Sequence, residues 1–227
     1  MKKTHQGCDL NSCFLCRGCL KDWLGALESH RESWVYKKGE SVFEEGQPVR
    51  GIYFIYKGRV KVHKNWGDSK PWILHFAREG DMIGYRGLGP ERIYPISATT
   101  LTEAHLCFID TSFFESTLQV NHALTYSLME FYASQLQAAE KRMANLVHME
   151  VKGRVAETLL MLNAEFGQSG GGVINITLTK QDLASYAGTT YETFSRMLNE
   201  LVKDQIVQVS GKTIEILSVP KLEKLLH

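Results

Sequence analysis

The hydrophobic pattern of the chain changes twice, and each change predicts a different kind of structure. Between about 33 and 109 the chain carries short runs of β-branched and aromatic residues separated by glycine-containing breaks. Such runs are typical of short strands joined by tight turns, so this region predicts a β-sandwich or β-roll. The expected strands are 34–36, 51–56, 59–63, 72–76, 96–100 and 105–109.

From about 112 to 166 the apolar residues recur with the period of a helix. Positions 129, 132, 136, 139, 143 and 146 are apolar at alternating gaps of three and four, which is typical of a coiled-coil seam. A second apolar face, Leu124, Leu128 and Phe131, can pack on the β domain and leave the seam for a partner. We therefore expect a parallel homodimer; the alternative is a seam that packs on the chain's own β domain.

The remaining residues have the layout of a winged helix-turn-helix. A flexible break at 168–172 and a strand at 173–177 precede two helical stretches, 179–188 and 189–198. Ala184 permits close helix approach, Gly188 makes the turn, and Thr189 or Thr190 caps the second helix. Runs at 206–209 and 213–216 predict a hairpin, whose tip residue Lys212 is placed to contact phosphate.

The second of these helices predicts a DNA-reading face. Glu192, Ser195 and Arg196 share one exposed face, opposite a buried face formed by Phe194, Leu198 and Leu201. Arg196 can donate to guanine, Glu192 can accept from cytosine, and Ser195 can contact a neighbouring base edge.

The start of the same helix offers two further DNA-binding candidates, and the polar residues also have a simpler interpretation. Thr190 and Tyr191, at its start, are additional candidates for DNA contact. The alternative is that Glu192 forms a capping box with Thr189 and that Arg196 is merely solvated.

Composition narrows the choice of function. The 227 residues carry 26 Lys+Arg and 25 Asp+Glu, a net charge of +1, and 44% are hydrophobic, which is typical of a globular chain. Nucleic-acid binding by bulk charge is therefore excluded, and the segment from 150 to 227, with 8 basic and 9 acidic residues, predicts a shallow salt dependence. No apolar run approaches the ~20 residues that cross a bilayer, and no signal sequence precedes the chain, so we expect a cytoplasmic protein without a membrane partner.

Four of the five cysteines lie in the first 19 residues. They are Cys8, Cys13, Cys16 and Cys19, and the fifth is Cys107. An odd count without a secretory signal argues against a disulfide framework and favours metal or redox chemistry. The spacing of Cys13, Cys16 and Cys19 is typical of iron–sulfur loops. The alternatives are structural zinc on the four N-terminal thiols, a thiol/disulfide switch, and no metal chemistry, with Cys107 a small buried hydrophobe.

From about Trp34 to its end the chain resembles the CRP/FNR family of bacterial transcription regulators. The most specific stretch runs from Glu192 to Arg196, where Glu192, Ser195 and Arg196 stand at the positions with which FNR-type members read a TTGAT-like half-site. The resemblance implies a homodimer on double-stranded DNA with a two-fold symmetric operator, and RNA polymerase as a further partner.

The resemblance also implies a sensor. FNR-type members hold a [4Fe-4S] cluster with N-terminal cysteines and one cysteine of the β-roll, and Cys107 lies where that remote ligand is expected. The implied ligands are Cys13, Cys16, Cys19 and Cys107, with Cys8 as a substitute, although FNR leaves a longer gap before its third N-terminal ligand.

Cyclic AMP is not the expected effector. Members that bind it use a Gly-Glu pair and an Arg-Ser pair, whereas this chain has Gly84-Tyr85-Arg86 and Pro95-Ile96-Ser97 at the corresponding stretches. A cyclic phosphate would lose its charge-assisted partner here. Gly84, Arg86 and Ser97 remain a candidate pocket for another anion, and haem is disfavoured for want of a ligand near Gly84.

Together these features predict an α+β fold: an N-terminal β-roll of the cyclic-nucleotide-binding type, a long dimerisation helix and a C-terminal winged helix-turn-helix. The expected segments are 1–32 cysteine-rich, 33–115 sensor, 116–150 dimerisation helix and 151–227 DNA-binding. The expected function is a dimeric, DNA-binding transcription regulator that senses oxygen or redox state. The alternative is a regulator with another small-molecule effector and a zinc or thiol site; no motif predicts an enzyme.

Overall fold

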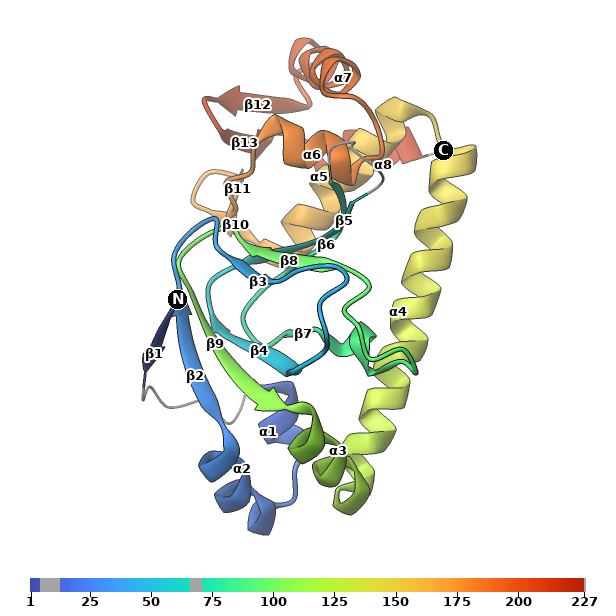
Figure 1. Cartoon of the computed structure of the whole chain (residues 1–227). Coiled ribbons are helices and arrows are strands. Elements are labelled where there is room, and N and C mark those ends of the chain that lie inside the picture. Colours follow the sequence, from blue (N-terminus) through green and yellow to red (C-terminus); the bar gives the residue numbers. More distant parts are fainter. Residues whose placement is uncertain (5–12, 66–70, 227) are drawn as a thin grey trace. The chain divides into compact units, whose positions relative to one another are not determined.

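The computed structural model describes residues 1–4, 13–65 and 71–226. The chain divides into two compact units, Met1–Gln135 and Leu136–His227, which are considered separately (Figure 1). Cys8 lies outside the described residues. Among the described residues, no helix combines the length and the apolar character needed to span a bilayer.

Two antiparallel sheets form most of the first unit. The five-stranded sheet has the order β1 (Lys2–Thr4), β2 (Glu32–Tyr36), β9 (Ala104–Asp110), β4 (Gly51–Lys57), β7 (Met82–Ile83). The four-stranded sheet has the order β3 (Ser41–Phe43), β8 (Ser97–Thr100), β5 (Val60–Lys64), β6 (Trp72–Ala77). All six predicted strands are present; β1, β3 and β7 are too short to show a period of two.

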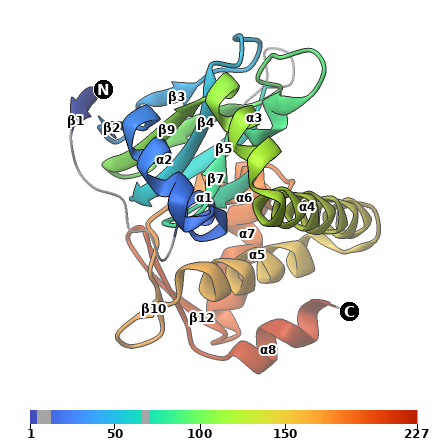
Figure 2. The ribbon, with the colours of Figure 1, turned by 90° about the horizontal axis from the view of Figure 1, so that it is seen from below.

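Alternation along β4 gives this unit two hydrophobic cores. Tyr53 and Ile55 pack between the two sheets, whereas Ile52 and Phe54 pack on the other face, because successive side chains of a strand point to opposite faces. Helices cover that second face (Figure 2). They are α1 (Phe14–Gly18), η1 (Lys21–Trp23), α2 (Leu24–His30), α3 (Thr111–Val120) and α4 (His122–His148), while η2 (Tyr85–Leu88) follows β7.

The helical region predicted to begin at 116 is divided at Asn121. α3 ends at Val120 and α4 begins at His122. The prediction of one helix from 116 to 150 is therefore wrong in its first residue, because the long helix begins only at His122. The Asn121 side chain is buried, donates to the Thr117 carbonyl and accepts from the Leu20 backbone N–H at 2.7 Å. An Asn side chain that bonds to nearby backbone competes with helix continuation, which explains the break.

The second unit has the predicted winged-helix elements. It contains α5 (Val151–Phe166), α6 (Lys180–Tyr186), α7 (Tyr191–Lys203), α8 (Val219–Glu223), η3 (Lys224–Leu226) and a sheet of order β10 (Gln168–Ser169), β11 (Val173–Ile174), β13 (Thr213–Ile216), β12 (Val207–Ser210). The segment 168–172, expected to be a flexible break, instead forms a hairpin in which β10 pairs with β11. The strand expected over 173–177 is shorter than predicted and ends at Ile174. The predicted α+β fold class is confirmed.

Candidate nucleic-acid interface and thiol cluster

The second helix of the helix-turn-helix, α7, begins at a side-chain cap. Thr190 is the N-cap residue, and its Oγ1 accepts from the backbone N–H of Thr193 at 3.2 Å. The capping box of Glu192 with Thr189 is therefore not formed: the cap lies one residue later, which places Glu192 in the first turn, where a carboxylate is favoured by the helix dipole. Phe194, Leu198 and Leu201 are buried as predicted.

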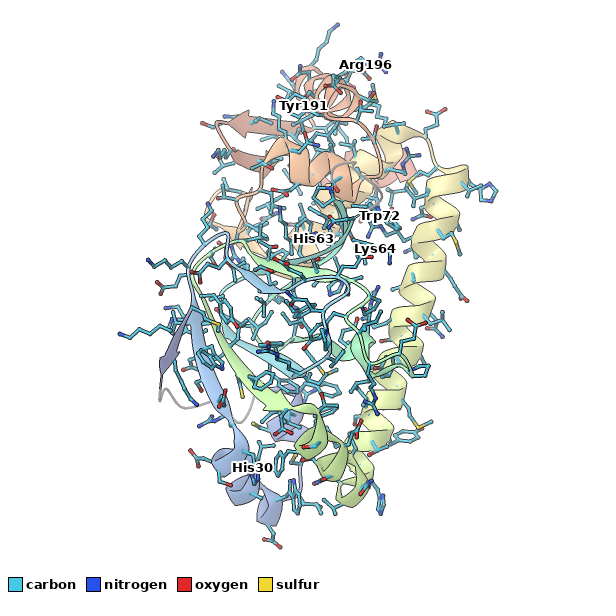
Figure 3. All side chains as sticks on the ribbon, viewed as in Figure 1. His30, His63, Lys64, Trp72, Tyr191 and Arg196 are labelled. Atoms are coloured by element: carbon cyan, nitrogen blue, oxygen red, sulfur yellow. The ribbon has the colours of Figure 1, made fainter. Side chains whose placement is uncertain are left out.

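Two of the three predicted base-reading residues, on the opposite face of α7, are exposed to solvent. Glu192 and Arg196 are exposed, whereas Ser195 is half-buried and its Oγ is buried without a hydrogen-bond partner among the described residues. Ser195 is thus less exposed than the sequence predicts, although it lies on the same face as Glu192 and Arg196, and its contact with a base stays a prediction. Figure 3 shows Arg196 and Tyr191 on α7 at the outer surface of their unit.

Around this face lies a shallow surface depression with a wider set of polar residues. It is lined by Glu192, Ser195, Arg196, Asn199, Glu200 and Lys203. Asn199 and Lys203 were not singled out from the sequence. They follow Arg196 by three and seven residues and therefore lie on the same face of the helix. The helical period of 3.6 residues would have been enough to predict this from the sequence.

The predicted wing is confirmed as a hairpin. β12 and β13 pair in register from Val207 with Ile216 to Ser210 with Thr213. Gly211 takes a φ of +60° in the turn, a conformation that favours glycine. Lys212 is exposed beside it, so its ammonium is accessible to a phosphate; that contact stays a prediction.

Two arginines hold the turn between α6 and α7. Arg142 of α4 donates to the Tyr186 carbonyl at 2.7 Å and lies 4.1 Å from the centroid of the Tyr186 ring. Arg154 of α5 donates from Nε to the Ala187 carbonyl at 3.1 Å and from Nη2 to the Gly188 carbonyl at 3.4 Å. These carbonyls have no partners within a helix that has ended, so the arginines satisfy them and fix the turn.

The four described cysteines converge although Cys107 is remote in sequence. Cys13 and Cys19 are the N-cap and C-cap residues of α1, Cys16 lies within that helix, and Cys107 lies on β9. Cys13, Cys16 and Cys107 are buried in one hydrophobic cluster, and Cys19 packs against it. None of the four forms a disulfide bond.

The surroundings of these thiols are dry. Leu15, which lies between Cys13 and Cys16 in the sequence, is almost completely buried. Phe54 and Phe114 belong to the same hydrophobic cluster as the cysteines. Burial, with a smaller contribution from nearby Cys13, raises the pKa of the Cys19 thiol to about 11. A compensating cation is therefore needed before several of these thiols can ionise together.

The thiol-bearing segment packs directly on α3 and α4. A Cβ added at Gly18 would lie 2.6 Å from Leu124 Cδ1, and the rings of Phe14 and Phe131 are 5.7 Å apart. Trp23 donates from Nε1 to Thr117 Oγ1 at 3.1 Å. A displacement of α1 would consequently disturb the first half of α4.

Comparison with known proteins identifies the fold and the family. Residues 33–121 match the family model of the cyclic nucleotide-binding domain, and residues 153–225 match the Crp-like helix-turn-helix domain. The anaerobic regulatory protein of Bacillus subtilis is 31% identical over 193 residues, which cover 83% of this chain and 81% of that protein. The chain belongs to the CRP/FNR family of transcription regulators. Its relatives in this comparison are transcription regulators rather than enzymes.

Two further proteins are similar to the chain over most of their length. The CRP-like cAMP-activated global transcriptional regulator of Mycobacterium tuberculosis is 27% identical over 203 residues, 88% of this chain and 91% of that protein. The structure of FixK2 from Bradyrhizobium japonicum has the same fold, with a TM-score of 0.77 at 24% identity, covering 86% of this chain and 96% of that one. Regulators of the CRP family bind DNA and are dimeric.

Several residues of the predicted apolar seam are exposed on the surface of α4. Met129, Leu136 and Met143 are each more than 60% exposed, and Tyr132 is 37% exposed. Leu146, the last predicted seam residue, instead packs on Gly188 of the helix-turn-helix. The alternative, a seam that packs on the chain's own β domain, is observed in part: Tyr132 donates to the Tyr85 carbonyl at 2.7 Å and its ring lies 5.6 Å from the Tyr85 ring, whereas Met129, Leu136 and Met143 stay exposed.

The three candidate effector residues are already engaged in the β-roll. Gly84 takes a φ of +87° and lies against the Tyr94 ring, and Arg86 lies over the ring of Tyr85. The buried Ser97 hydroxyl accepts from the Glu45 backbone N–H at 2.9 Å. An anion at these positions stays a prediction, and Ser97 would have to release a backbone partner to bind it.

Proposed function

We propose that this CRP/FNR-type regulator responds to oxygen or redox state through a [4Fe-4S] cluster. The ligands would be Cys13, Cys16, Cys19 and Cys107. When bound, such a cluster supplies an oxygen-labile, redox-active centre whose four thiolate ligands come from two separate parts of the chain. The name of the related anaerobic regulatory protein of Bacillus subtilis supports a response of this kind.

The observation that carries the proposal is the convergence of Cys107 with the N-terminal cysteines. Three of these thiols are buried in one hydrophobic cluster and the fourth, that of Cys19, packs against it. A hydrophobic shell of this kind limits solvent access to a metal centre and tunes its potential. A cysteine buried only for packing would not require three others beside it.

A cluster and a single zinc ion place different demands on their thiolate ligands, and the zinc alternative also uses Cys8, which lies outside the described residues. Among the residues 13–65 and 71–226, no three His, Cys, Asp or Glu side chains lie close enough to share one metal ion. A single Zn²⁺ requires every thiolate about 2.3 Å from one centre. A four-iron cluster binds each thiolate at a different iron, so it suits thiols that lie farther apart.

Packing provides the route from the thiols to DNA. Cys13, Cys16 and Cys19 position α1, and α1 packs on α4 through Gly18 and Phe14. Loss of the common centre would release these cysteines from Cys107 and so free α1 to move against α4. Because α4 carries the exposed apolar seam, this movement would change the dimer and thereby the spacing of the two α7 helices on DNA.

The test is anaerobic purification followed by assay of iron, sulfide and zinc per chain and by visible absorption before and after air. We expect about four irons and four sulfides, with bleaching in air. Cys107→Ala should lose the cluster and the effect of air on DNA binding. Cys8→Ala is the matched control and should retain both, since Cys8 is only the substitute ligand.

Other outcomes decide against the cluster. A Cys107→Ala protein with full iron content and an unchanged oxygen response would contradict the ligand assignment. Stoichiometric zinc without colour would favour the second candidate, a regulator with a structural zinc or thiol site and a different small-molecule effector.

The operator and the transcription partner are also proposals. A dimer related by a two-fold axis reads two half-sites one helical turn apart, so the preferred target is a palindromic sequence with TTGAT-like halves. RNA polymerase is the expected partner at the promoter. Footprinting should protect both halves equally, and protection of a single half-site would contradict the symmetric arrangement.

A further inference from the structure

A cavity of about 440 Å³ is lined by residues of strands β2, β3, β4 and β9 and of the loops beside them. Its volume lies within the range of small-molecule sites. None of the candidate effector residues Gly84, Arg86 and Ser97 lines it. Half of its lining residues are aromatic: Trp34, Tyr36, Phe43, Tyr53, Tyr94 and Phe108.

The aromatic walls are held in a fixed arrangement. The Phe43 and Tyr94 rings stack 4.2 Å apart at 18°, and the Tyr53 and Phe108 rings lie 5.0 Å apart at 50°. Phe43, Tyr53 and Tyr94 are buried. Rigid rings of this kind present flat surfaces that favour a planar aromatic ligand over a branched aliphatic one.

Two phenols supply hydrogen-bonding capacity inside the cavity. The Tyr36 and Tyr53 hydroxyls lie close enough to interact electrostatically, and each can donate and accept a hydrogen bond. The Tyr94 hydroxyl is already engaged, since it donates to the Gly51 carbonyl at 2.7 Å. Burial raises the pKa of Tyr36 to about 12, so its hydroxyl is protonated at neutral pH.

The charge at the cavity is positive. Glu32, which also lines it, is neutralised by Lys3 at 2.7 Å and accepts from Trp34 Nε1 at 3.2 Å. Arg50 is exposed at the lining, and its guanidinium forms no ion pair within the described ranges. An unpaired guanidinium beside aromatic walls is suited to a carboxylate, which it can bind with two parallel hydrogen bonds.

We propose that this cavity binds a small planar aromatic carboxylate of one or two fused rings. The ring system lies among Phe43, Tyr53 and Trp34, and the carboxylate binds Arg50. This site is independent of the proposed cluster, because no cysteine lines it.

The experiment is isothermal titration calorimetry of the full chain with 2-naphthoate. We expect saturable binding at one site per chain, with 2-naphthamide, the uncharged analogue, at least tenfold weaker. Arg50→Gln should weaken naphthoate at least tenfold and leave the naphthamide affinity unchanged, while Arg50→Lys should restore part of the naphthoate affinity. Lys38→Gln removes a nearby exposed cation outside the cavity and should have no effect.

A second variant tests the cavity itself. Val42→Phe adds bulk to the lining and should abolish binding of both compounds, with circular dichroism verifying the fold. The proposal is overturned by heats that do not saturate at millimolar naphthoate. It is equally overturned by Arg50→Gln binding naphthoate as tightly as the unaltered chain.

Discussion

At the residue scale, neighbouring residues of α7 differ in what they can offer to DNA. Arg196 is exposed with five donors, whereas the hydroxyl of Ser195 is buried without a partner in the described structure. A hydroxyl in this state reaches a base only after its side chain rotates. The base-reading role of Ser195 therefore stays a prediction. The same prediction for Arg196 is the stronger of the two, because its side chain is exposed.

Replacement of Arg196 tests this difference. Arg196→Ala should weaken binding to a cognate duplex by about 1–3 kcal/mol and relax specificity at one base pair. Ser195→Ala should leave binding and stability within about 0.5 kcal/mol, because it removes a hydroxyl that has no partner to lose. Fluorescence anisotropy with cognate and singly substituted duplexes measures both, and an Arg196→Ala protein with undiminished base preference would contradict the assignment.

Gly188 is constrained in two ways. Its φ is +65°, and an added Cβ would collide with Leu146 Cδ2. Gly188→Ala should therefore lower the free energy of unfolding by roughly 1–2 kcal/mol from the backbone alone, and by more from the collision. Urea denaturation measures this loss.

The two contributions at Gly188 can be separated. Adding Leu146→Ala to Gly188→Ala should recover only the steric part. Gly170→Ala is the control, since nothing lies within 4 Å of its added Cβ and its φ is not positive. Equal stability of the Gly188 and Gly170 variants would show that the turn tolerates a side chain.

At the element scale, α4 is attached to the helix-turn-helix through Arg142. The guanidinium both donates to the Tyr186 carbonyl and stacks on the Tyr186 ring, and burial lowers its pKa without removing its charge. This contact fixes the end of α6 and hence the start of α7. It provides a direct connection between the helix that carries the dimer seam and the helix that reads DNA.

Loss of that connection should be measurable. Arg142→Ala should lower the free energy of unfolding by about 2–3 kcal/mol, from a charged hydrogen bond and a cation–π contact. It should also weaken DNA binding, since the turn loses one of its two arginines. The neighbouring exposed Lys141→Ala is the control, and identical unfolding curves for the two variants would disprove the role of Arg142.

At the scale of the whole molecule, we expect the exposed seam of α4 to form the dimer interface. Met129, Leu136 and Met143 would be costly to leave in water, and their burial between two copies removes that cost. Because each chain supplies one α7, reading two half-sites depends on this association.

Charge on the seam should separate the copies. Leu136→Glu combined with Met143→Glu places four carboxylates along the shared seam and should shift the protein to monomers at micromolar concentration. Gln137→Glu, exposed on the same helix but off the seam, should remain dimeric. Sedimentation equilibrium distinguishes the species, and a persistent dimer of the double variant would place the interface elsewhere.

The sequence by itself determined the elements and their faces. Runs of β-branched and aromatic residues between glycine-containing breaks located the six main strands. The period of three to four located the helical region from 112 to 166 and the face of α7 that buries Phe194, Leu198 and Leu201. These features follow from local geometry, because the side-chain period of an element is fixed by its own backbone. The resemblance at 192–196 likewise identified the family from consecutive residues.

The tertiary structure decided what no local pattern contains. It brought Cys107 into one hydrophobic cluster with residues of α1, interrupted the long helix at Asn121, left the Ser195 hydroxyl buried, and placed Arg142 on Tyr186. Each of these outcomes depends on how residues far apart in the chain pack, or on which of several rotamers the packing allows. A periodic pattern shows which face of an element is buried, but only the assembled cores determine which residues meet there.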